Sequence, residues 1–168
     1  CHYKAGKDMV CFYINNFKHK ALFKGKTLSL GGSLDDNPYR KESYTGDVSA
    51  IIMNNLPLWA EMKRAPKLET ALIAEWDKKL ERMLLETPQE NVTSFSGVPT
   101  WVLVLIQKMV ADQRVDNILD IWPNLELFAH GGVAFDPYRD LFKELIPDED
   151  FNYQEVYNAS EGFFAIQD

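Results

Sequence analysis

Strand-like and helix-like segments alternate after about residue 92, and this alternation restricts the fold of the chain more than any other feature. Three runs rich in β-branched and aromatic residues are expected to be strands: 92–95, 125–129 and 153–157. The segments between them include Pro99 and Pro137, and proline suits the first turn of a helix because its missing N–H would be unpaired there. The pattern predicts an α/β fold, with a mostly parallel sheet and flanking helices.

Parallel strands end at one edge of a sheet, and open α/β folds bind ligands there. The strand ends are Ser96-Gly97, His130-Gly131-Gly132 and Ala159-Ser160-Glu161. We therefore expect these three segments to form one ligand site. Taken alone, Gly131-Gly132 indicates only a tight turn, although two glycines also let a backbone approach a flat ligand. His130 either contacts a substrate or is simply hydrogen-bonded at its strand end.

The segment from Tyr157 to Gly162 places a ring, a hydroxyl and a carboxylate within five positions. Such a set suits a nucleotide: Tyr157 can lie against a base and Ser160 can donate to a phosphate. Glu161 can bind a hard cation. The alternative for Glu161 is a structural salt bridge.

The first 91 residues are expected to contain edge strands followed by a helical segment. The predicted elements are strands at 9–14 and 28–30, a turn at 31–33 and a polar surface loop at 35–45. The lysines Lys18, Lys20, Lys24 and Lys26 indicate a hairpin or strand edge. They either protect that edge or form a basic strip for phosphate.

Three helices are predicted between residues 48 and 106. Asp47 can cap the first, at 48–53, and Pro57 should end it. Apolar residues from Leu68 to Leu84 recur at spacings of four and three, which predicts one amphipathic helix after Pro66. Residues 101–106 are apolar on every face, so a helix there is expected to be buried on both sides.

The composition fits a globular protein without general affinity for polyanions. The chain has 168 residues, of which 46% are hydrophobic, and a net charge of -7. That charge favours neither nucleic acid nor anionic membranes as partners. Cys1 and Cys11 either form one disulfide or are thiols in a reducing compartment, and we expect a cytoplasmic location. His2 and His19 lack partners at a zinc-site spacing.

Three blocks of sequence together resemble a known family. They are Phe95-Ser96-Gly97-Val98-Pro99-Thr100-Trp101, Trp122-Pro123-Asn124-Leu125 leading to His130-Gly131-Gly132, and Tyr157-Asn158-Ala159-Ser160-Glu161-Gly162. In order and spacing they resemble the middle of the GH3 acyl acid–amido synthetases, particularly the bacterial members. These are adenylate-forming enzymes, and the resemblance extends over nearly the whole chain.

The resemblance implies a two-step reaction that uses ATP and Mg²⁺. The carboxylate of an acyl acid attacks the α-phosphate of ATP, and the amine of an amino acid then displaces AMP. Ser160 and Glu161 would be the catalytic residues, with Glu161 as the Mg²⁺ ligand. The implied ATP-binding residues are Tyr157, Asn158, Ala159, Ser160, Gly131 and Gly132. The implied acyl-pocket residues are Val98, Trp101 and His130.

Two parts of the family pattern, a Ser/Thr-rich phosphate loop and a carboxyl-terminal lid domain, do not occur in these 168 residues. We therefore expect residues 1–168 to be the central part of a large adenylation domain, with negligible catalysis on their own. Two alternatives stay open: another adenylate-forming ligase, such as an acyl-CoA ligase, and a non-catalytic α/β binding module. The acyl acid, the amino acid and the oligomeric state are also open.

Overall fold

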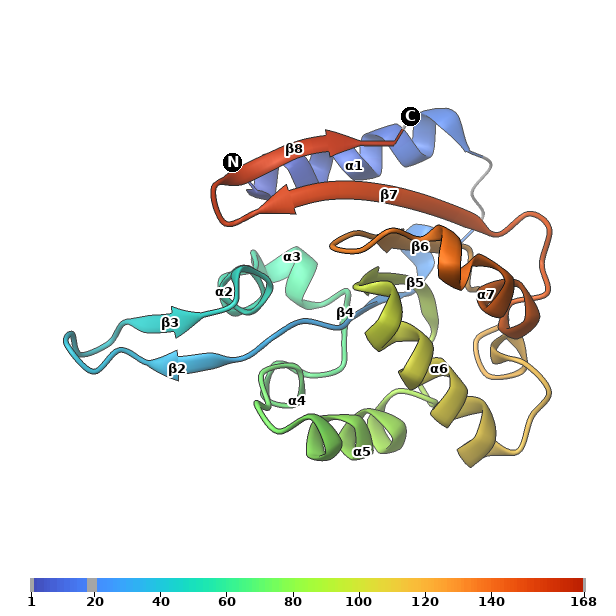
Figure 1. The fold of residues 1–168 in the computed structure, drawn as a ribbon, viewed down its shortest axis with the longest axis horizontal. Helices are drawn as coiled ribbons and strands as arrows, with labels where there is room; N and C mark the ends of the chain where they lie inside the picture. The colour runs from blue at the N-terminus through green and yellow to red at the C-terminus, as the bar shows by residue number, and fades with distance from the viewer. Residues whose placement is uncertain (1, 18–20, 168) are drawn as a thin grey trace.

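The computed structural model describes residues 2–17 and 21–167, and its centre is a six-stranded sheet (Figure 1). The strand order is β4 (Arg64–Ala65), β1 (Lys26–Ser29), β5 (Val92–Gly97), β6 (Leu127–His130), β7 (Asn152–Ala159) and β8 (Gly162–Ile166). The first five are parallel to their neighbours, and β8 returns antiparallel to β7. The predicted α/β class is confirmed.

The predicted alternation after residue 92 is also confirmed. Helix α6 (Pro99–Gln113) connects β5 to β6, and α7 (Arg139–Leu145) precedes β7. Short 3₁₀ helices occur at Ile118–Asp120 and Asp136–Tyr138. Pro99 lies in the first turn of α6, as expected.

The core lies where helices pack on β5 and β6. Phe95 and Phe128 of these strands are fully buried and meet edge to face, with ring centroids 6.2 Å apart. Helices α5, α6 and α7 supply further buried side chains to the same core, including Met83, Ile106 and Phe142. Strand β6 reads as a largely apolar run, as expected for a strand covered in this way, whereas β5 also buries the polar side chains of Thr93 and Ser94.

The strand predicted at residues 9–14 is wrong, because this run lies inside helix α1 (His2–Asn16). Ala5, Met9 and Tyr13 are spaced by four, and Ala5 and Tyr13 are buried while Met9 is partly buried. The helix lies beside β8 (Figure 1). Burial of this stripe therefore decides the conformation against the local β propensity of the run.

The edge interpretation of the lysine series is wrong for the two lysines that the structure describes. Lys26 begins β1, which lies between β4 and β5, and its Nζ pairs with Glu90 at 2.8 Å. Lys24 ends a 3₁₀ helix (Leu22–Lys24). Lys18, Lys20, His19 and Cys1 lie outside the described residues.

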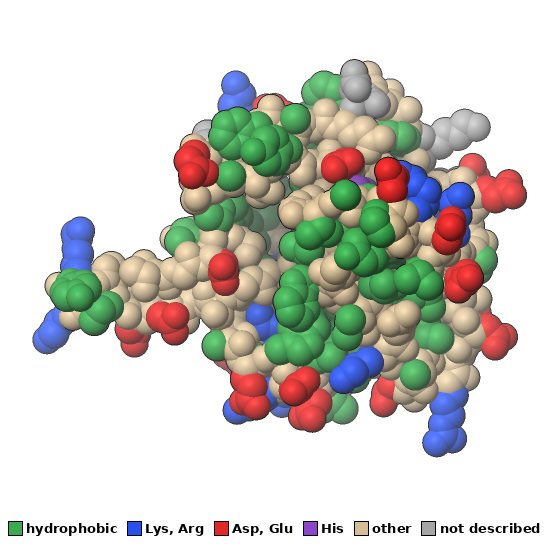
Figure 2. Space-filling view, in the orientation of Figure 1, with side chains coloured by type: hydrophobic (Ala, Val, Ile, Leu, Met, Phe, Trp, Pro, Cys, Tyr) green, Lys and Arg blue, Asp and Glu red, His purple; other side chains and the backbone are tan. Residues whose placement is uncertain are grey.

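The segment predicted to be a surface loop contains an antiparallel hairpin, β2 (Leu34–Asp36) and β3 (Tyr44–Gly46). It projects from the body of the molecule, and its tip carries lysine and arginine side chains (Figures 1 and 2). Helix α2 (Val48–Asn54) follows, with Asp47 at its N-cap position as expected. The Asp47 side chain does not cap the helix, because its Oδ2 accepts a hydrogen bond from the Ser33 N–H at 3.1 Å.

The single helix expected from Leu68 to Leu84 is divided into α4 (Leu68–Ala71) and α5 (Trp76–Glu86). Two further short elements precede them: helix α3 (Leu58–Glu61), with Pro57 at its N-cap position, and strand β4. Helix α6 is not buried on both sides, since Trp101 is 49% exposed and Val104 is 36% exposed. In the described part of the chain, every helix is too short or too polar to span a membrane.

Candidate functional site

A cleft of about 720 Å³ opens at the carboxyl ends of β1, β5, β6 and β7. The strand-end segments that line it are 29–33, 96–98, 129–132 and 158–160. Their placement confirms that the strand ends named in the sequence lie at one edge of the sheet. Of the residues in those three strand ends, Glu161 does not line the cleft. The fourth segment, after β1, was not anticipated as part of a site.

The glycines after β6 allow the backbone to pass close to its neighbours. A Cβ on Gly131 would collide with the carbonyl oxygen of Val156 in β7. Gly132 has φ +87°, a conformation that other residues rarely adopt, and a Cβ there would lie 3.3 Å from Val98. This part of the cleft wall is therefore backbone, with its N–H and C=O groups close to any occupant.

The segment at the end of β7 and in the turn after it is divided between the cleft and its surroundings. Asn158, Ala159 and Ser160 line the cleft, whereas Tyr157 and Glu161 do not. Tyr157 is 62% exposed, and its ring centroid lies 5.2 Å from that of Phe164. The exposed Glu161 carboxylate accepts a hydrogen bond from the Ser160 hydroxyl at 3.3 Å. No ion pair to Glu161 is found among the described residues.

Glu161 provides a single carboxylate, and the described residues contain no group of three acidic, histidine or cysteine side chains that could hold a metal. Mg²⁺ is commonly bound in proteins by one or two carboxylates together with substrate phosphates and water. Glu161 therefore fits an ion brought by a phosphate ligand, and does not fit a site built from protein ligands alone.

Val98, Trp101 and His130, the residues expected in an acyl pocket, all line the cleft. Trp101 packs against Trp76 of α5 with ring centroids 4.5 Å apart, and Trp76 also lines the cleft. Ile52, Met53 and Leu56 add further apolar side chains. The cleft thus has an apolar region next to the backbone-rich strand ends.

His130 is a neutral, buried histidine. It is 2% exposed, and its ring stacks on Phe135 with centroids 4.2 Å apart. Burial, and secondly the positive charge of Arg139, lower the pKa of His130 to about 4. Its Nδ1 has no hydrogen-bond partner among the described residues. The imidazole is therefore uncharged at neutral pH.

This pKa predicts a loss of stability in mild acid. Between about pH 6.5 and pH 4 the unfolded chain binds a proton at residue 130 that the folded chain does not. The free energy of unfolding should therefore fall, by up to about 3 kcal/mol, as the pH is lowered through this range. Urea unfolding at several pH values tests this. His130→Phe should show a flatter profile than the wild type, and parallel profiles would contradict the assignment.

Sequence reasoning missed several contributors to the cleft, among them Gly31-Gly32, Asp47, Ser49 and Lys79. Gly31-Gly32 follows a predicted strand, and the strand-end argument would have included it had β1 been placed inside the sheet. Lys79 lies three positions after Trp76 and four before Met83, on the apolar stripe of its helix. A lysine on the apolar stripe of a helix was the sequence signal that could have identified Lys79 as a cleft residue.

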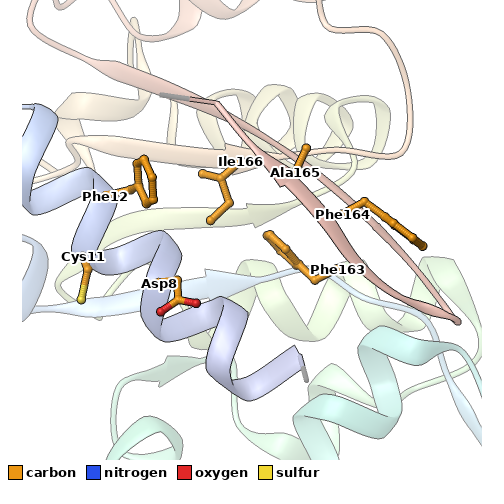
Figure 3. Close-up of a pocket in the computed structure, with 7 residues that line it drawn as sticks. All are labelled: Asp8, Cys11, Phe12, Phe163, Phe164, Ala165 and Ile166. Atoms are coloured by element: carbon orange, nitrogen blue, oxygen red, sulfur yellow. The ribbon is translucent and has the colours of Figure 1, made fainter.

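A second pocket, of about 360 Å³, lies between α1 and β8 (Figure 3). Its lining residues are Asp8, Cys11, Phe12, Phe163, Phe164, Ala165 and Ile166. Cys11 is an exposed free thiol. None of the three predicted strand-end segments contributes to this pocket, so the larger cleft is the candidate functional site.

Comparison with known families gives one match. The model of the GH3 family N-terminal domain matches residues 2–151. No curated protein matches the chain. The matched range includes the ends of β1, β5 and β6, whereas Tyr157 to Gly162 follows it. The roles suggested for that last segment therefore depend on its own residues and on its position beside the cleft.

Proposed function

The chain belongs to the GH3 family, and from this premise we propose that it forms part of the ATP-binding domain of an acyl acid–amido synthetase. In the proposed reaction, the carboxylate of an acyl acid attacks the α-phosphate of ATP and releases pyrophosphate. The amine of an amino acid then attacks the acyl carbon, forms the amide and releases AMP. The observation that carries the proposal is the convergence of four strand ends, with their glycines and Ser160, on one cleft.

The roles proposed for the nucleotide follow from the groups around the end of β7. Tyr157 presents an exposed ring face that suits stacking on adenine. Ser160 lines the cleft, where its hydroxyl can donate to a phosphate oxygen. Glu161 would hold Mg²⁺, which neutralises charge that develops on the phosphoryl oxygens during attack. Asn158, Ala159, Gly131 and Gly132 complete the proposed ATP-binding set.

The acyl group is proposed to occupy the apolar region beside Val98, Trp101 and His130. This placement puts the acyl chain against the indole rings, with its carboxylate toward the strand ends. A neutral His130 favours this assignment, since a charged imidazolium would be costly next to an apolar acyl chain.

Trp101→Ala should weaken use of the acyl acid selectively. Removing this indole opens the apolar wall, so KM for the acid should rise about tenfold while KM for ATP stays within about twofold. Val104→Ala on the same helix is the control, because Val104 is part-exposed and lies outside the cleft. Equal changes in both KM values for Trp101→Ala would contradict the acyl assignment.

The function itself is tested by supplying the acceptors separately to the intact enzyme that contains this chain. With ATP and an acyl acid, an amino acid should yield an amide and coenzyme A should yield no thioester. The opposite result would identify an acyl-CoA ligase. The isolated 168 residues are expected to show negligible conjugation, and measurable turnover by them would overturn that expectation.

A further inference from the structure

Lys79 of α5 is a buried cation in the wall of the cleft. The residue is 4% exposed and belongs to the cleft lining. Its Nζ donates hydrogen bonds to the carbonyl oxygens of Gly31, at 2.8 Å, and Gly32, at 3.1 Å. Both carbonyls belong to the loop that follows β1. The ammonium therefore lies at a strand end, beside the segments that form the proposed substrate site.

The loop that Lys79 contacts is fixed from its other side. The Gly32 N–H donates to the Ser49 hydroxyl at 3.0 Å, and the Ser33 N–H donates to the Asp47 carboxylate at 3.1 Å. A Cβ on Gly32 would collide with the Asp47 side chain. The backbone there has little room to rearrange, so its two carbonyls hold the ammonium in one position.

These contacts leave the charge of Lys79 only partly compensated. An ammonium has three N–H donors, and two of them are directed at neutral carbonyl oxygens. No ion pair to Lys79 is found within the described ranges. Burial lowers the pKa of Lys79, and the more distant Asp47 carboxylate opposes that change. A buried charge without a counter-ion is costly, and an anion in the cleft would relieve that cost.

Lys79 is also the single lysine or arginine among the lining residues identified for this cleft. We propose that Lys79 binds an anionic oxygen of a substrate through its remaining N–H donor. The identity of the substrate rests on the proposed function, which offers two sources of such an oxygen: a phosphate of ATP and the carboxylate of the acyl acid.

The test is calorimetric titration of the intact enzyme with two separate probes, Mg–ATP and benzoate. Lys79→Met should weaken binding of one probe by about tenfold or more, the scale of one hydrogen bond to a charged group. Weaker binding of ATP alone assigns the oxygen to a phosphate, and weaker binding of benzoate alone assigns it to the acid. Lys78→Met is the matched control, because Lys78 is the exposed neighbour of Lys79 on the same helix. This variant should bind both probes with wild-type affinity.

Lys79→Gln separates anion binding from support of the loop. Glutamine keeps an N–H donor and removes the charge, so it should lose affinity for the same probe even where Lys79→Met fails to fold. Wild-type affinity of the folded Lys79→Gln protein for both probes would overturn the proposal. So would a wild-type enzyme that binds neither probe.

The outcomes distinguish this proposal from the proposed function. Acid-dependent release of pyrophosphate that is equal in the wild type and in both Lys79 variants would leave the synthetase proposal standing and refute the anion site. Binding that depends on Lys79, without any acid-dependent release of pyrophosphate, would support the anion site and contradict the synthetase.

Discussion

Glu161→Ala in the intact enzyme is expected to slow formation of the acyl-adenylate about a hundredfold, the scale of losing one preorganised electrostatic contact. Glu161 lies beside Ser160 at the turn after β7, and no ion pair to it is found among the described residues. Its proposed role is to hold the Mg²⁺ that accompanies ATP. Acid-dependent ATP–pyrophosphate exchange measures the adenylation step directly.

Two comparisons make the Glu161 experiment specific. Glu149→Ala removes an exposed carboxylate from the turn before β7, away from the cleft, and should leave exchange unchanged. Glu161→Gln should raise the Mg²⁺ concentration needed for half-maximal exchange. Exchange at the wild-type rate and the wild-type Mg²⁺ requirement in both Glu161 variants would refute the metal role.

Gly131→Ala is expected to lower the free energy of unfolding by about 2 kcal/mol, in the range found for overpacked sites. The added Cβ would collide with the backbone carbonyl of Val156, which belongs to the neighbouring strand and cannot rotate away as a side chain could. The end of β6 must then move away from β7, which disturbs the cleft. Chemical denaturation of the variant and the wild type measures the loss.

Gly162→Ala is the matched control for Gly131→Ala. A Cβ on Gly162 meets nothing within 4 Å, and the residue lies close in sequence to the same cleft. Its effect should stay within about 0.5 kcal/mol, because the added methyl group has no neighbouring atom to displace. Equal stability of the two variants would show that the close approach at Gly131 is not as tight as the structure indicates.

The second half of the fold was predictable because the local sequence pattern there favours the same secondary structure that tertiary packing requires. Strand β6 lies in an apolar run, the start of β5 is rich in β-branched and aromatic residues, and Pro99 marks the helix between them. Once parallel strands are inferred, the geometry of the sheet alone brings Gly97 and Gly131 to one edge. Part of the site therefore followed from the order of elements, before any side-chain contact was known.

The first half was less predictable because burial decided between local alternatives. Residues 9–14 favour a strand by composition, but Ala5, Met9 and Tyr13 form a stripe that is buried only in a helix. The regular apolar spacing from Leu68 onward likewise continues through the break between α4 and α5. That break precedes Trp76, which packs on Trp101 at the cleft. Such choices depend on partners far away in sequence.

Lys79 shows most clearly what the sequence does not reveal about the site. Its partners, Gly31 and Gly32, are 48 and 47 positions away in the chain. Their proximity requires β1 to lie inside the sheet, and the sequence pattern instead suggested an edge. Most of the residues expected to bind the nucleotide follow one another in sequence at the end of β7, whereas Lys79 is far in sequence from the loop that it contacts.

The most direct test of the synthetase proposal is the identity of the nucleotide product in the complete reaction. The intact enzyme is incubated with Mg–ATP, a panel of aromatic and aliphatic acids, and a mixture of amino acids. The proposal predicts one AMP and one pyrophosphate for each amide formed, with no product when the acid is omitted. Formation of ADP and phosphate with the amide would contradict it, as would the absence of any acid-dependent AMP.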